Sequence, residues 1–146
     1  QAFIQTFQPT ITLPLENGCS LLCYHGSPGS FDDIIRPQTP DDEVRGYLKP
    51  QEGTIYTGGH THTQFIRHFG RTFHFNPGSV GLTYRHDQPD DHFRCDPWAE
   101  YAILNSQGDR LALEFRRVPI DVQRLIEVYQ TSGRPHAEIA VAQYQD

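Results

Sequence analysis

The sequence predicts a mixed α/β (α+β) fold, because segments with the residue types of short strands are interspersed with segments of helical character. Turn-forming residues separate these segments along the whole chain, including eleven prolines. Hydrophobic residues make up 36% of the 146 residues and charged residues 21%, as in an ordinary globular protein rather than a disordered one. A chain of this length is sufficient for one domain.

Strands are predicted where apolar residues alternate with polar ones or form a short run bounded by turn residues. These segments are residues 10–15, 19–24, 54–57, 65–75, 101–104 and 111–118. Residues 16–18 join the first two as a hairpin, residues 70–71 turn the fourth, and residues 106–109 join the last two. Residues 85–97 show no periodicity, so we expect an irregular surface excursion there.

Helices are predicted from start signals, stop signals and apolar spacing. Pro40 followed by two aspartates marks a start and Pro50 a stop, which predicts a helix over residues 41–48. Residues 121–129 have apolar side chains at helical spacing, and residues 137–143 form a shorter helical run. No apolar run approaches the roughly 18 residues of a membrane-spanning helix, so we expect no membrane partner.

The charge and the cysteines argue against two further classes of protein. The formal net charge is -6 and the arginines are scattered, so we expect no extended nucleic-acid-binding surface. Cys19, Cys23 and Cys95 are odd in number and contain no C-x-x-C pair, so neither a disulfide framework nor a zinc knuckle is expected. Reduced thiols indicate a cytoplasmic protein.

Histidines at the ends of predicted strands indicate a metal site. His60 and His62 follow the strand predicted over residues 54–57. If this segment is extended, their Cα atoms lie about 6 to 7 Å apart on one face. Each histidine could then hold one ion of a pair roughly 3.5 to 4 Å apart. His25 follows another predicted strand in the same way, although two surface histidines at a turn would explain the spacing of His60 and His62 equally well.

Three motifs together resemble the second half of the calcineurin-like metallophosphoesterases. They are CYHGSP at residues 23–28, GHTH at residues 59–62 and NPGSVG at residues 76–81. The closest resemblance is to small bacterial and archaeal phosphodiesterase-like proteins. It implies the C-terminal half of a four-layer α-β-β-α sandwich. In that fold His25 and His60 would ligate one metal ion and His62 the other.

The resemblance also implies a function, the metal-dependent hydrolysis of phosphate esters by a phosphodiesterase or phosphatase. Its cofactors would be two divalent ions, whether manganese, iron, zinc or nickel. The family's other ligands lie in upstream Asp-x-His, Gly-Asp and Gly-Asn-His motifs, and the last of these would supply the leaving-group acid. The nearest match to Asp-x-His here, Asp90-Asp91-His92, lies in the wrong half of the domain and within the irregular excursion, so we do not count it as one of these upstream motifs.

The absence of these motifs predicts that the site is shared with another segment. Three neutral imidazoles without a bridging carboxylate leave two divalent charges uncompensated. We therefore expect residues 1–146 to be the C-terminal portion of one metallophosphoesterase domain. Its partner would be the N-terminal half of the same domain, and this chain alone would be inactive. The opening at Gln1 and the lack of any methionine point the same way.

Gly78, Ser79 and Arg85 are candidates for binding the phosphate-ester substrate. Backbone N–H groups of a glycine-containing turn form anion-binding concavities, and an arginine can hold a phosphate with two hydrogen bonds. A simple tight turn and a solvated arginine are the alternatives.

Two other functions stay open. One is a non-catalytic scaffold or binding module on the same fold. Such a protein would be expected to have lost metal ligands, whereas His25, His60 and His62 are all present. The other is a histidine-ligated metal oxygenase on a β-barrel. That chemistry requires a carboxylate among the ligands, which residues 60–62 do not offer.

Overall fold

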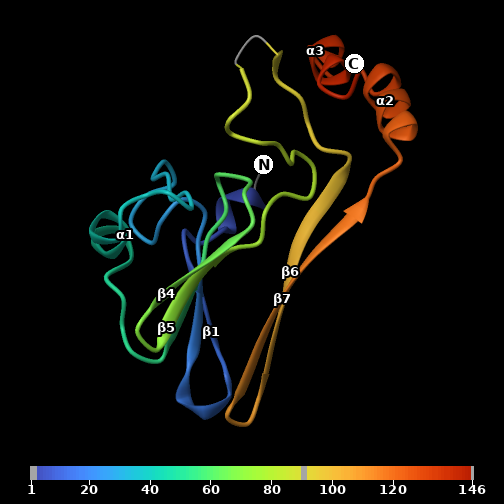
Figure 1. Ribbon diagram of the computed structural model, residues 1–146. Coiled ribbons are helices and arrows are strands. Elements are labelled where there is room, and N and C mark those ends of the chain that lie inside the picture. Colours follow the sequence, from blue (N-terminus) through green and yellow to red (C-terminus); the bar gives the residue numbers. More distant parts are fainter. Residues whose placement is uncertain (1–2, 90–91, 146) are drawn as a thin grey trace.

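The computed structural model describes residues 3–89 and 92–145. A helix, a five-stranded sheet and a long two-stranded ribbon lie in layers, and two further helices follow near the C-terminus (Figure 1). The strands are β1 Ile11–Pro14, β2 Ser20–Cys23, β3 Thr54–Thr57, β4 Phe65–Phe69, β5 Thr72–Asn76, β6 Trp98–Gln107 and β7 Arg110–Pro119. The helices are α1 Asp41–Leu48, α2 Val122–Thr131 and α3 Ala137–Ala142, with 3-10 turns at Ile4–Thr6 and Glu16–Gly18.

The five-stranded sheet has the order β1-β2-β3-β5-β4. Its outer pairs, β1 with β2 and β4 with β5, are antiparallel, whereas β2, β3 and β5 run parallel. In the parallel register Cys23 pairs with Thr57, so β2 and β3 end at the same edge of the sheet. The loops that follow these two strands therefore leave the sheet next to each other, as ligand-bearing loops do in parallel sheets.

Helix α1 covers one face of the sheet (Figure 1). Three acidic residues in its first turn suit the positive end of the helix dipole, and the chain leaves it through Lys49 in a left-handed conformation. Val44 and Leu48 of α1 are buried against Tyr56 and Phe69 of the sheet. Burying side chains of this kind stabilises the fold by about 1.5–3 kcal/mol each, so this contact fixes the helix on the sheet.

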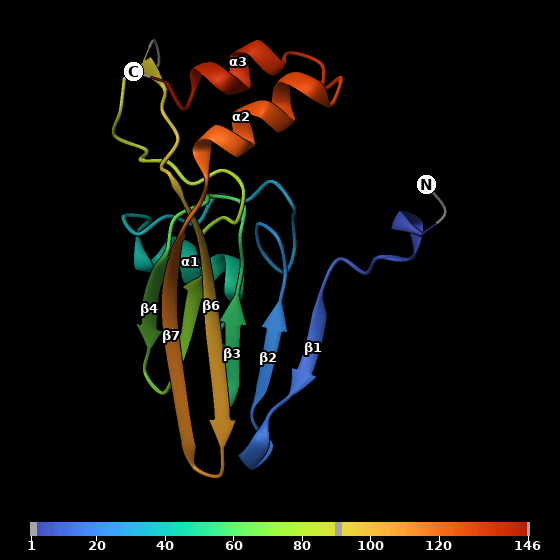
Figure 2. The same ribbon diagram turned by 90° about the vertical axis from the view of Figure 1, so that its right-hand side faces the viewer.

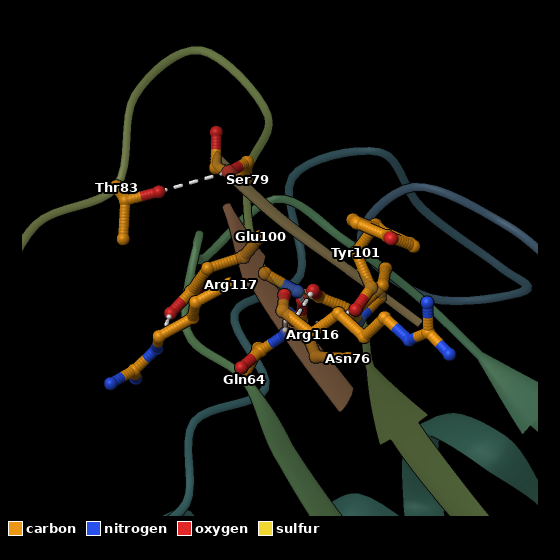
Figure 3. A network of polar contacts seen from close by, with 10 residues as sticks. Gln64, Asn76, Ser79, Thr83, Glu100, Tyr101, Arg116 and Arg117 are labelled. Carbon is orange, nitrogen blue, oxygen red and sulfur yellow. Dashed lines mark hydrogen bonds and ion pairs between the residues drawn. The ribbon is translucent and has the colours of Figure 1, made fainter. Parts of the chain in front are cut away.

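The β6–β7 ribbon lies against the other face of the sheet (Figures 1 and 2). The ring centroids of Phe75 and Phe115 are 6.4 Å apart. The Gln64 side-chain amide donates to the carbonyls of Tyr101 and Arg116 at 3.1 and 3.2 Å, which ties the ribbon to the loop before β4 (Figure 3). The order of layers is thus helix, sheet and ribbon.

The elements predicted from the sequence are confirmed, and α1 and β3 have the predicted bounds. The ribbon is longer than expected, because β6 begins at Trp98 instead of residue 101 and pairs with β7 through to Gln107. The excursion predicted over residues 85–97 carries no strand or α-helix before Trp98 in its described part, and residues 90–91 lie outside the described residues. Among the described helices, none has the length and apolar character needed to cross a membrane.

Candidate metal site

The parallel strands β2 and β3 place His25 and His60 side by side, because each histidine lies in the loop that follows its strand. Tyr24 N donates to Thr57 O at 3.0 Å and Gly59 N donates to His25 O at 2.8 Å, so pairing continues past the strand ends. His25 Nε2 lies 3.0 Å from His60 Nδ1. Metal–nitrogen bonds are about 2.0–2.1 Å long, so nitrogens about 3 Å apart can bind one ion from adjacent positions. The two nitrogens lie at hydrogen-bond distance from each other, and this spacing would also let both bind one metal ion.

His62 faces a separate group of residues. Its Nδ1 is 2.7 Å from the carbonyl oxygen of Leu82, so Nδ1 carries the proton and donates it. Its ring meets Tyr84 edge to face, with centroids 5.6 Å apart. A hydrogen bond of this kind leaves Nε2 of His62 unprotonated, so that this nitrogen could bind a metal ion, and it fixes the orientation of the ring.

The described histidines do not make a closed metal centre by themselves. Across residues 3–89 and 92–145, no three His, Cys, Asp or Glu side chains gather so that they could hold an ion together. An ion between His25 and His60 would complete its coordination with water or with ligands from outside these residues. His25 and His60 lie together and His62 lies apart, as expected if they bind two different ions. Metal binding by all three stays a prediction.

The backbone of the GHTH loop differs from the extended segment assumed from the sequence. His60 has φ 64° and His62 has φ 55°, and both values lie in the left-handed region of backbone conformation, which residues other than glycine rarely adopt. Thr61 N donates to Gly59 O at 2.7 Å, so the chain turns tightly here. The spacing argument based on an extended strand is therefore wrong, and the turn itself aims the two imidazoles. Left-handed residues cost about 1–2 kcal/mol each, so the surroundings must hold them in place.

Asn76 holds this loop from beneath. Its side chain is 1% exposed, and its Nδ2 donates to Gly59 O at 2.7 Å and to Thr61 Oγ1 at 3.0 Å. Its Oδ1 accepts from Gly78 N at 2.9 Å. Thr61 Oγ1 in turn donates to Ile35 O at 3.3 Å. One buried amide thus bonds to the residues on both sides of His60. Sequence reasoning placed Asn76 in a motif without giving it this role.

The loop that begins at His25 is fixed by Ser27. Its hydroxyl accepts from the N–H groups of Gly29 and Ser30, both at 3.1 Å, and donates to Asp33 Oδ2 at 2.5 Å. Before it, Gly26 has no room for a side chain, because a Cβ would lie 2.6 Å from Phe31 O. The HGSPGS segment is therefore a closed turn that holds His25 at the sheet edge.

The three candidate substrate-binding residues lie on the next loop. Gly78 has φ 86° and its N–H donates to Asn76, so the turn itself uses that donor. Ser79 Oγ accepts from Leu82 N at 3.0 Å and its carbonyl accepts from Thr83, as Figure 3 shows. These contacts are those of the tight-turn alternative for Gly78. Phosphate binding by Gly78 and Ser79 stays a prediction.

Arg85 lines the same pocket as His62. Its guanidinium holds the Asp87 carboxylate with two hydrogen bonds of 3.0 and 2.7 Å, and both side chains are exposed. The pairing lowers the pKa of Asp87 and raises that of Arg85. A phosphate at Arg85 would have to compete with Asp87, and its role in substrate binding stays a prediction.

His74 is a buried structural histidine of strand β5. It is 1% exposed and its ring stacks on Tyr24 at a centroid distance of 6.1 Å. Burial, helped by the positive charge of Arg67, lowers the pKa of His74 to about 4. The residue is therefore neutral near pH 7 and is buried between Tyr24 and Phe65.

Comparison with known proteins identifies the fold. No protein-family model matches this sequence, and no curated protein sequence matches it. A hypothetical protein from Pyrococcus horikoshii matches 99% of this chain with a TM-score of 0.74 and 16% identity. A metallophosphoesterase from Sphaerobacter thermophilus matches 97% of it with a TM-score of 0.65 and 17% identity. Vps29 from Entamoeba histolytica, solved in complex with zinc, matches 79% with a TM-score of 0.53 and 19% identity.

These structural likenesses show a mixed α/β fold of the calcineurin-like metallophosphoesterase type, as the sequence predicts. The chain spans 54%, 60% and 62% of the lengths of the three proteins, respectively. It therefore corresponds to less than two thirds of each.

Proposed function

We propose that this chain carries part of a binuclear metal centre that hydrolyses phosphate esters. The observation that supports this most is the 3.0 Å approach of His25 Nε2 to His60 Nδ1 at the ends of adjacent parallel strands. The fold supports it too, because a protein described as a metallophosphoesterase shares the architecture. A fold alone does not define an activity, so the proposal rests on the histidines.

In this proposal His25 and His60 hold one divalent ion and His62 holds a second through its Nε2. When bound, the two ions supply a water of lowered pKa and stabilise charge on the phosphate oxygens. The chain's own residues orient the imidazoles. Leu82 O fixes the ring of His62, and Asn76 fixes the backbone around His60. Imidazole ligands suit zinc, iron and nickel, and Vps29 with its bound zinc makes zinc the first metal to test.

We further propose that the activity is that of a phosphodiesterase or phosphatase of the small phosphodiesterase-like subgroup. The carboxylate ligands would come from another part of the same domain, since the described residues offer none beside the histidine pair. Cys19, Cys23 and Cys95 are unpaired, which suits the reducing cytoplasm. The oxygenase alternative has no support in this fold, because the open five-stranded sheet is not a β-barrel.

Steady-state kinetics of the full-length protein test the proposal. Both ions act on one water and one phosphate, so His60→Ala and His62→Ala should each lower kcat by orders of magnitude, and not merely raise KM. The double variant should cost little more than the worse single one. His68→Ala is the matched control, because His68 lies on β4 with its ring against Phe73. Near-normal kcat in either single variant, or an equal defect in His68→Ala, would contradict the two-ion proposal.

A further inference from the structure

Next to His62 the surface forms a pocket of about 260 Å³ whose charges the proposed metal chemistry does not use. The GHTH loop, the segment after Ser79 and the β6–β7 ribbon all contribute to it. Its charged side chains are Arg85, Asp87, Asp96, Glu100 and Arg117. The pocket is thus placed to contact whatever part of a substrate extends from a phosphate held at His62.

Both arginines of the pocket are already paired. Arg117 Nε donates to Glu100 Oε1 at 2.8 Å, as Figure 3 shows. Glu100 is 2% exposed, so this carboxylate depends on Arg117 for its partner. Arg85 is held by both carboxylate oxygens of Asp87. The two guanidiniums therefore offer little net positive charge to a bound anion.

The remaining acid, Asp96, differs from the other two acids of the pocket. Among the residues that the structure describes, Asp96 makes no ion pair within 4.0 Å, whereas the other two acids of the pocket do. Its backbone N–H donates to Thr83 O at 2.7 Å, which fixes its position on the pocket wall. Burial raises the pKa of Asp96, although Arg117 and Arg85 act in the opposite direction. The three carboxylates and two guanidiniums together carry a formal charge of −1, before the charge of any metal ion on His62 is added.

We propose that this pocket binds the alcohol half of the phosphate ester, and that Asp96 selects a small polar alcohol without negative charge. The inference rests on the proposed function. An additional carboxylate or phosphate on the alcohol would face Asp96, and like charges at close range are strongly disfavoured. Hydroxyl or amino groups could instead donate to it. Ligand pockets usually measure about 300–1,000 Å³, so this smaller volume suits an alcohol of a few heavy atoms beside Tyr84.

Binding of two matched phosphate esters to the zinc-loaded full-length protein tests this selection without relying on turnover. Glycerol 3-phosphate and 3-phosphoglycerate differ in size very little, but only the second has a carboxylate on its alcohol. NMR titration should show glycerol 3-phosphate binding about tenfold more tightly or better. Asp96→Asn should remove most of that difference. Asp109→Asn, an exposed acid in the β6–β7 turn, should leave it unchanged.

The results separate this inference from the proposed function. Equal affinities in the wild type, or a preference that survives in Asp96→Asn, would overturn the selection by Asp96. Hydrolysis of bis(p-nitrophenyl) phosphate is measured in parallel, because this ester reports the proposed activity whatever the pocket prefers. Failure of that hydrolysis together with a clear Asp96-dependent preference would contradict the enzyme activity and leave the pocket as a binding site for polar phosphate esters.

Discussion

Replacing Asn76 with alanine should lower both the stability of the protein and its affinity for zinc. Asn76→Ala removes hydrogen bonds to Gly59, Thr61 and Gly78, at 2.7, 3.0 and 2.9 Å. Each contributes about 0.5–1.5 kcal/mol net, and each abandoned buried partner adds a desolvation cost. We expect the free energy of unfolding to fall by about 3–5 kcal/mol. Because the left-handed loop around His60 loses its support, zinc affinity should fall as well.

Gln64→Ala is the matched control for Asn76→Ala. The Gln64 amide also makes three hydrogen bonds, to the carbonyls of Pro77, Tyr101 and Arg116 (Figure 3). Two of these bonds fix the ribbon and the third reaches Pro77, but none is made to the backbone around His60. Gln64→Ala should therefore destabilise the protein without a comparable loss of zinc affinity. Urea unfolding gives the stability, and calorimetric zinc titration below the unfolding transition gives the affinity. Unchanged zinc affinity in folded Asn76→Ala, or an equal loss in Gln64→Ala, would refute this reasoning.

Two further predictions concern stability. The pKa of His74 lies near 4 in the folded protein against about 6.5 when unfolded, so protonation favours unfolding and stability is lost as the pH falls from about 6.5 towards 4. By pH 5 this loss should reach about 2 kcal/mol, measured by urea unfolding against pH, and a folded His74→Phe variant with the same pH dependence would show that another group is responsible. Gly78→Ala should cost about 2–4 kcal/mol, because φ is 86° and a Cβ would overlap the Glu100 side chain. Gly81→Ala, which meets nothing within 4 Å, should change the unfolding midpoint little, and equal effects of the two substitutions would contradict the steric argument.

Local sequence patterns predict most of the fold because its elements carry clear local signals. Helix α1 has a proline and acidic residues at its start, and β3 is a short β-branched and aromatic run before two glycines. The extension of β6 to Gln107 was not predictable from apolar alternation, since its outer half is stabilised by pairing with β7 and not by burial. At the other end Trp98 pairs with Pro119, which lies 21 residues away, and such a pairing leaves no local pattern in the sequence.

The candidate site was predictable in its residues but not in its geometry. His25 and His60 could be identified from the strand-and-glycine context of each, yet their contact depends on the parallel pairing of β2 with β3. The left-handed backbone of His60 and His62 contradicts the usual preference of histidine. It is held by Asn76, which lies 16 residues beyond His60. Tertiary contacts of this kind override local propensity, and so the extended segment expected from the sequence was wrong.

Anomalous X-ray diffraction from zinc-soaked crystals of the full-length protein would test the shared metal ligation by His25 and His60 most directly. The proposed function predicts an ion at about 2.0–2.1 Å from both His25 Nε2 and His60 Nδ1, and a second ion at Nε2 of His62. An ion bound to only one of His25 and His60, or no ion at this pair in fully loaded crystals, would contradict it.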